Sequence, residues 1–156
     1  MAGKLSENKN IVFVLKPADN QGGLAGDSIN MGKVRRVAFI LLFGSITGDA
    51  VLTLKSGATA GTETTAETFH YRLADGDQAA ADADTYGDWT DSSSLTLTAA
   101  TYDNRTLIVE IDSDELTADQ PWLTLSLSGA ASTLFSSVVA VCDPKIEAHD
   151  IPTVIA

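Results

Sequence analysis

The chain has 156 residues, of which 44% are hydrophobic, and a formal net charge of −11. This length predicts a single domain with a buried core. A strongly acidic body repels the phosphate groups of nucleic acids and of acidic membranes, so neither is an expected partner. Thr, Ser, Gly and Ala are abundant, which favours short strands joined by turns over a helical bundle.

Positive charge is concentrated near the N-terminus. The first 36 residues have six basic and three acidic side chains, whereas the rest of the chain has four basic and eighteen acidic ones. Two interpretations stay open for the basic portion: a solvated strand edge and tail, or a surface that meets an acidic protein.

Neither the N-terminus nor the cysteine content suggests secretion. Cys142 is the only cysteine, so no disulfide can form within the chain, and its apolar neighbours predict a buried side chain. Residues 1–10 lack the apolar segment of a signal peptide, and no apolar run is long enough to span a bilayer. We expect synthesis in a cytoplasm and a flexible or extended N-terminal arm over residues 1–10.

The first strand is expected over residues 11–15, ended by Pro17, which cannot donate to a strand ladder. Residues 33–55 predict a central hairpin, with a turn at Gly44, Gly48 and Asp49. Its first strand is apolar on both faces, a pattern typical of a strand in the middle of a sandwich.

Further strands are expected in the second half of the chain, around residues 68–73, 95–97, 107–111, 122–128 and 134–142. About eight strands with frequent turns predict an all-β fold, a two-sheet antiparallel sandwich that is jelly-roll-like, over residues 11–143. An immunoglobulin-like sandwich is the second choice, because its two cysteines are absent. Residues 144–156 are expected to form a C-terminal arm.

The sequence offers little chemistry. His70 and His149 are far apart and have no nucleophile motif beside them, so we expect no enzymatic activity. The acidic segment from Asp82 matches a calcium loop at two carboxylates and a glycine but lacks the bidentate Glu at the twelfth position. A solvated loop is favoured over a cation site near Asp82, Asp84 and Asp88, and no cofactor is expected.

Trp89 and Trp122 leave two interpretations open. They could form a platform on which a sugar stacks. Each lies beside a predicted turn, however, where an aromatic side chain more often covers the end of a sandwich.

Residues 22–73 resemble a pattern found in small structural proteins of tailed bacteriophages. The pattern is a Gly-rich loop, the segment SINMG, an apolar strand, the turn GSITGDA, a second strand, and a Thr/Ala-rich loop before the aromatic–Arg strand FHYRL. The resemblance implies a β-sandwich and the role of a capsid decoration, or cement, protein. It also implies the major capsid protein as partner, a homotrimer, and a location on the capsid exterior of the virion.

Two alternatives remain beside that role. One is a carbohydrate-binding or adhesin module of a phage tail or fibre, and the other is a jelly-roll shell subunit. For the decoration role, the candidate interface combines the basic N-terminal portion with the apolar C-terminal arm; its residues are Lys4, Lys9, Lys33, Arg35, Arg36, Ile151, Val154 and Ile155.

Overall fold

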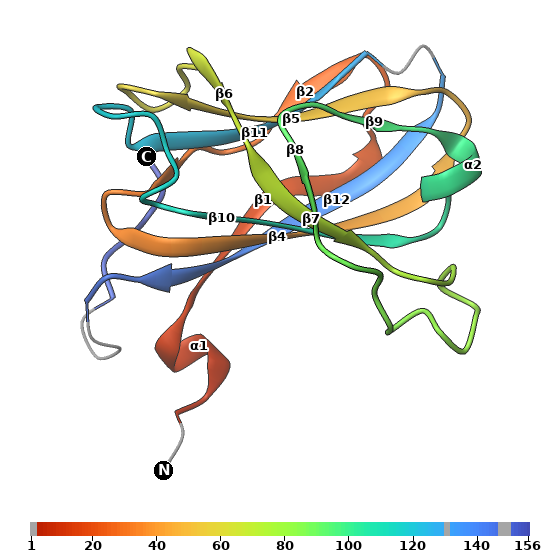
Figure 1. The fold of residues 1–156 in the computed structure, drawn as a ribbon, viewed down its shortest axis with the longest axis horizontal. Coiled ribbons are helices and arrows are strands. Elements are labelled where there is room, and N and C mark those ends of the chain that lie inside the picture. Colours follow the sequence, from red (N-terminus) through yellow and green to blue (C-terminus); the bar gives the residue numbers. More distant parts are fainter. Residues whose placement is uncertain (1–2, 130–131, 147–150) are drawn as a thin grey trace.

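A computed structural model describes residues 3–129, 132–146 and 151–156. This part of the chain forms two stacked β-sheets with two four-residue helices (Figure 1). Sheet A has the strand order β1-β12-β4-β10-β7-β8, with bounds Asn10–Asp19, Leu134–Pro144, Val34–Ile46, Thr106–Asp112, Phe69–Leu73 and Thr90–Ser92. Sheet B has the order β2-β11-β5-β6, with bounds Gly23–Ala25, Trp122–Ser128, Ala50–Gly57 and Thr65–Glu67. β3 (Ile29–Asn30) pairs with β11, and β9 (Leu95–Leu97) pairs with β5.

The predicted two-sheet antiparallel sandwich is confirmed, and the described residues contain twelve strands where about eight were expected. The additional strands are short. β2 and β3 lie in the loop after the first strand, and β8 lies within the acidic connection. Strands of two or three residues show too little alternation to be recognised in a sequence.

The predicted hairpin at residues 33–55 is wrong. β4 pairs with β12 and β10 in sheet A, whereas β5 pairs with β11, β6 and β9 in sheet B. The turn near Gly48 therefore carries the chain from one sheet to the other. A connection between sheets and a hairpin share the same local signals, because both join two apolar strands through a turn.

β1 also extends further than predicted, through Pro17 to Asp19. It lies at the edge of sheet A and pairs only with β12, and its register with β12 shifts between Leu15 and Ala18. Proline is tolerated at an edge strand and at an irregularity of this kind, because no ladder hydrogen bond is lost there.

The core lies between the sheets and follows the alternation of the strands. One side chain in two points inward, and these inward side chains are fully or almost fully buried. Cys142 is buried as predicted, and burial raises the pKa of its thiol to about 12. Large, fully buried side chains come from both sheets, among them Phe39, Phe69, Leu41, Leu107 and Ile111 of sheet A and Leu52, Leu54, Leu123 and Leu125 of sheet B.

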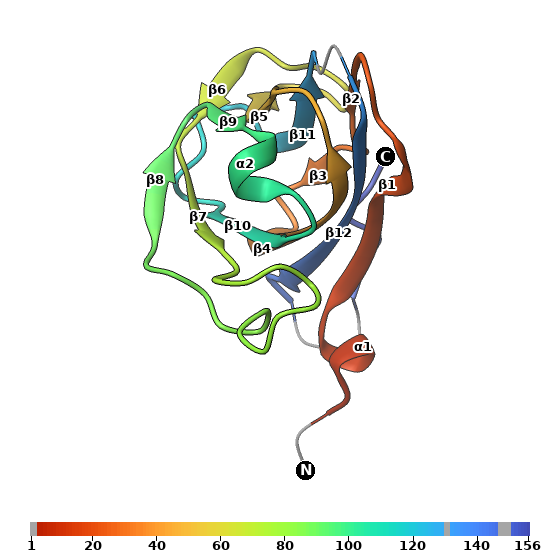
Figure 2. The same ribbon diagram turned by 90° about the vertical axis from the view of Figure 1, so that its right-hand side faces the viewer.

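The two ends of the chain differ in how closely they pack against the sandwich. Near the C-terminus, Val154 is buried in the core and Ile155 forms a bridge with Ile29. Near the N-terminus, α1 (Leu5–Asn8) lies within the segment expected to be flexible or extended, and it has no buried residue. Figures 1 and 2 both show α1 standing away from the sandwich.

α2 (Ala99–Tyr102) covers one end of the sandwich, where Tyr102 packs edge-on against Phe43. Burial raises the pKa of the Tyr102 hydroxyl to about 12. Neither helix in the described part of the chain has the length and hydrophobicity needed to cross a membrane.

Candidate interaction surface on sheet A

The outer face of sheet A carries a continuous set of apolar side chains, which we call the apolar strip. Register places Phe13, Val139, Ile40 and Ile108 side by side on four adjacent strands. A second row, two residues along each strand, begins with Ile11, Val141 and Ala38. The strip consists of Ile11, Phe13, Ala38, Ile40, Leu42, Ile108, Val139 and Val141.

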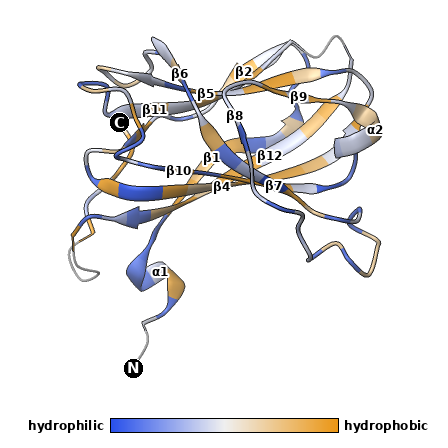
Figure 3. Ribbon diagram, viewed as in Figure 1, coloured by the Kyte–Doolittle hydropathy of each residue, from blue (hydrophilic) through white to orange (hydrophobic). Residues whose placement is uncertain are grey.

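The strip is open to solvent in the isolated chain. Phe13 is 58% exposed, Ile11 51% and Leu42 49%, while Ile40, Ile108, Val139 and Val141 are partly exposed. In Figure 3, hydrophobic colour runs along much of β4, with a short hydrophilic stretch near its start. Contiguous apolar surface of this kind is typical of contacts with other proteins.

β4 lies in the middle of sheet A, as its apolar pattern indicates, but only one of its faces belongs to the core. Val37, Phe39 and Leu41 face the core, but Ala38, Ile40 and Leu42 face outward. Within the described residues, no further layer covers them. A strand that is apolar on both faces can pack one face against its own core and the other against a second molecule.

A charged cluster borders one end of the strip. Asp143 accepts a hydrogen bond from Lys9 Nζ at 2.5 Å and from Arg35 Nη2 at 2.6 Å. Partial burial opposes the charge of Asp143, but these two hydrogen bonds outweigh it and lower the pKa of the carboxyl. The cluster joins β4 and β12 to the residue that precedes β1.

Next to this cluster, Arg36 and Asp112 form a bidentate ion pair. Arg36 donates from Nε to one oxygen of Asp112 at 2.5 Å and from Nη2 to the other at 2.8 Å. Register places these residues opposite each other on β4 and β10. Their hydrogen bonds lower the pKa of Asp112 and raise that of Arg36, because each charge stabilises the other.

His70 joins two segments that are distant in sequence. Its Nδ1 lies 2.6 Å from Asp91 Oδ1 on β8, and its Nε2 lies 2.8 Å from Glu115 Oε1 in the loop after β10. The hydrogen bonds with Glu115 and Asp91 raise the pKa of the imidazole. Only the doubly protonated ring can donate to both carboxylates at once.

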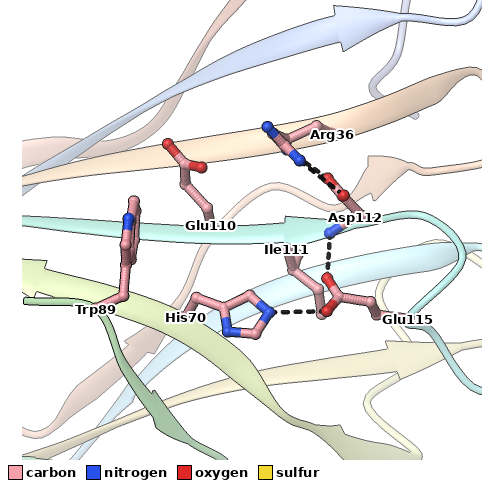
Figure 4. Close-up of a pocket in the computed structure, with 7 residues that line it drawn as sticks. All are labelled: Arg36, His70, Trp89, Glu110, Ile111, Asp112 and Glu115. Carbon is pink, nitrogen blue, oxygen red and sulfur yellow. Dashed lines mark hydrogen bonds and ion pairs between the residues drawn. The ribbon is translucent and has the colours of Figure 1, made fainter.

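These side chains line a groove of about 410 Å³, shown in Figure 4, and its lining residues are Arg36, His70, Trp89, Glu110, Ile111, Asp112 and Glu115. Glu110 lies opposite Ala38 of the strip on one side and His70 on the other. Within the described part of the chain, the Glu110 carboxylate accepts no hydrogen bond and forms no ion pair, although it attracts the nearby Arg36 guanidinium. The groove therefore continues the strip and contains a carboxylate that has no hydrogen-bond partner.

Trp89 is 47% exposed at the rim of the groove, but it is not a bare platform. The Arg72 guanidinium lies 5.2 Å from its ring centroid and 6.0 Å from that of Tyr86. Arg72 also donates to the backbone oxygen of Gly87 at 2.8 Å. These contacts hold the acidic connection against β7 and occupy aromatic surface that a sugar would need.

The groove holds His70 between carboxylates. While both ring nitrogens donate to carboxylates, neither has a lone pair available to accept a proton. Asp91, Glu115 and Asp112 are engaged with His70, Arg36 or backbone N–H groups, whereas the Glu110 carboxylate accepts no hydrogen bond within the described residues. The arrangement offers fixed charges beside an apolar surface, as at the border of a protein–protein contact.

The residues of the predicted interface do not form one surface. Lys9, Arg35 and Arg36 lie close together beside the strip, but in ion pairs within the chain. Lys33 donates to the backbone oxygen of Thr153 at 3.0 Å and so holds the C-terminal segment. Lys4 is exposed next to α1.

The apolar residues of the C-terminal arm are placed differently from one another. Val154 is buried in the core of its own chain, and its backbone oxygen accepts from Asn30 N at 2.7 Å. Ile151 is partly exposed and Ile155 is 37% exposed. His149 lies outside the described residues. Whether Ile151 and Ile155 meet a partner stays a prediction.

The acidic connection does not bring its carboxylates together. Within the described ranges, no three His, Cys, Asp or Glu side chains are grouped so that they could hold a metal ion. Asp82 and Asp84 lie in turns of the connection, Asp88 lies in the irregular segment before β8, and the backbone oxygen of Asp82 accepts a hydrogen bond from the Thr85 hydroxyl.

The strip and the groove were missed in the sequence. The apolar alternation of β1, β4 and β10 is visible, but it does not reveal which face lacks a cover. The partners of His70 are 21 and 45 residues away, and no local pattern connects them. The one available signal was the predicted outward direction of His70 on its strand, which is confirmed.

Comparisons with known proteins give a fold and no family. No protein-family model matches the chain, and no curated protein matches it. Among solved structures, the chain is similar to the SPBc2 prophage-derived protein YomS, with a TM-score of 0.51 and 12% sequence identity. The match covers 85% of this chain and 92% of that one. At this identity the two proteins are shown to share a fold.

Proposed function

We propose that this chain is a non-enzymatic structural protein of a phage virion, which binds the major capsid protein lattice and stabilises the capsid from outside. The observation that carries the proposal is the apolar strip on sheet A. Eight apolar side chains on four adjacent strands form a surface suited to burial against protein.

Two further observations support the phage context. The fold is similar to that of a prophage-derived protein over most of both chains. Residues 22–73 also have the pattern of small structural proteins of tailed phages. In this proposal the chain works as a homo-oligomer, a trimer, on the virion exterior, and it contacts neither nucleic acid nor membrane.

The chemistry of the surface fits a role in assembly. The basic residues beside the strip, Lys9, Arg35 and Arg36, are already paired within the chain, so a partner would bury apolar area without stripping water from these charges. The net charge of −11 would keep decorated particles apart in solution.

The test is the location and copy number of the chain in purified particles. Particles from cells that carry the encoding phage or prophage are purified by density gradient, and the chain is quantified against the major capsid protein. We expect a copy number that is a multiple set by the shell lattice, with density on the outer surface in electron cryomicroscopy.

A variant of the strip sharpens the test. Phe13→Glu places a charge on the exposed strip, and Thr96→Glu places the same charge on an exposed residue of β9 in sheet B. We expect Phe13→Glu to reduce the copy number on particles and Thr96→Glu to leave it unchanged. Absence of the wild-type chain from particles would contradict the proposal, as would glycan binding lost on Trp89→Ala, which would favour the adhesin alternative.

A further inference from the structure

The N-terminal arm, residues 3–9, is the part of the chain that contributes least to its own core. α1 has no buried residue, Leu5 is 59% exposed, and Lys4 beside it is exposed. An isolated helix of one turn is unstable in water, because it costs more backbone entropy than its hydrogen bonds recover. Packing against another surface would stabilise it.

The base of the arm is fixed at the edge of the sandwich. Lys9 is bound to Asp143, and Asn10 donates from Nδ2 to the backbone oxygen of Pro152 at 3.0 Å. From there, both views show the arm leaving the sandwich (Figures 1 and 2). The arm is thus held in a position where a neighbouring molecule can meet it.

The strip and groove complement this arm in chemistry. Leu5 needs an apolar surface, and the strip is one. Within the described residues, the Lys4 ammonium forms no ion pair, and the Glu110 carboxylate forms none either, although it attracts the nearby Arg36 guanidinium. Glu110 lies in register with Ala38, so its carboxylate borders the strip directly. Across the whole chain, the acidic body would attract the basic N-terminal portion of another copy.

We infer that the arm of one copy docks on the apolar strip of a second copy, with Leu5 against the strip and Lys4 at Glu110. The contact is head-to-tail, since the arm and the strip are different surfaces of the same chain. Such contacts close into rings when the rotation between copies permits it. This inference does not depend on binding to a capsid.

The experiment uses the full purified chain in sedimentation velocity over a range of concentrations. We expect the wild type to self-associate and a chain lacking residues 2–8 to sediment as a monomer. Leu5→Asp should raise the dissociation constant by about tenfold or more, since it removes the burial of one leucine. Phe13→Glu on the strip should weaken association in the same way.

The matched control is Leu24→Asp, because Leu24 is 42% exposed on β2 of sheet B, away from the strip. It should leave association unchanged. Thermal unfolding of each variant checks that the sandwich is intact; all substituted side chains are exposed, so we expect melting temperatures close to that of the wild type.

Charge reversal tests the pairing itself. Lys4→Glu and Glu110→Lys should each weaken association by roughly two- to fivefold, and the double variant should recover it. A monomeric wild type, or association unchanged by removal of the arm, overturns the inference. The strip is also the surface that the proposed function assigns to the capsid, so Phe13→Glu should affect both contacts. Leu5→Asp changes only the arm and should leave the copy number on particles unchanged, so failure of this contact is distinguishable from failure of the proposed capsid role.

Discussion

The outer faces of the two sheets are built from different side chains. Sheet A presents branched and aromatic residues such as Phe13, Ile40 and Val141. At the corresponding positions sheet B presents small polar residues, among them Thr53 and Ser126, which lie opposite each other on β5 and β11. The inner faces are alike, since both are apolar and buried. The difference therefore concerns what each sheet meets outside its own chain.

Sheet B satisfies part of its polar face internally, although the buried hydroxyl of Ser126 has no hydrogen-bond partner within the described residues. The hydroxyls of Ser28 and Thr124 lie 2.8 Å apart and are buried, and Ser28 Oγ also accepts from Gly61 N at 2.9 Å. A loop of the same chain thus covers part of sheet B through hydrogen bonds. On sheet A the comparable positions are apolar and uncovered, which is why we assign the intermolecular contacts to that sheet.

The largest difference in stability is expected between substitutions on the inner face and on the outer face of sheet A. Phe39→Ala removes a fully buried ring and should lower the free energy of unfolding by about 3–5 kcal/mol. Phe13→Ala removes an exposed ring and should change it by less than about 1 kcal/mol. Denaturant titration of the monomeric chain measures both, and similar losses would contradict the assignment of an outer face.

The next largest loss of stability is expected where a loop of the same chain covers sheet B. Ser28→Ala leaves the Thr124 hydroxyl and the Gly61 N–H without their partner. A buried group left unpaired costs about 1–3 kcal/mol, and we expect a loss of unfolding free energy in that range. Thr96→Ala, at an exposed site on β9, serves as the control. A neutral Ser28→Ala would mean that the loop is not held by these hydrogen bonds.

A smaller contribution to stability is expected from the ion pair of Arg36 and Asp112 beside the strip. A double-mutant cycle on Arg36→Ala and Asp112→Ala should give a coupling of about 0.2–1 kcal/mol, because both side chains remain partly exposed. Raising the salt concentration should reduce it. A coupling of zero would show that the bidentate geometry adds no stability in solution.

The smallest effect is a pH dependence at His70. Its pKa is raised in the folded chain, so the stabilisation is complete below the unfolded value of about 6.5 and is lost as pH rises through the folded-state pKa. We expect the free energy of unfolding to fall between about pH 6 and 8 relative to the His70→Gln variant. Parallel pH profiles for the two proteins would contradict the two carboxylate contacts.

Much of the fold could be predicted because alternation along a strand is a local property. Leu107, Val109 and Ile111 lie at alternate positions of β10 and so share one face, and all three are buried. The direction of His70 follows from the same rule. The candidate site could not be predicted in this way, since it combines β1, β4, β10 and β12, which are distant in the sequence.

The sequence by itself determined that this chain is a β-sandwich, because side-chain periodicity sets which residues of a strand share a face. Only the tertiary structure decided that β4 and β5 belong to different sheets and that Val154 closes the core of its own chain. It also decided that Ile40 faces outward. Pairing and coverage depend on contacts between distant segments, and no local pattern specifies those contacts.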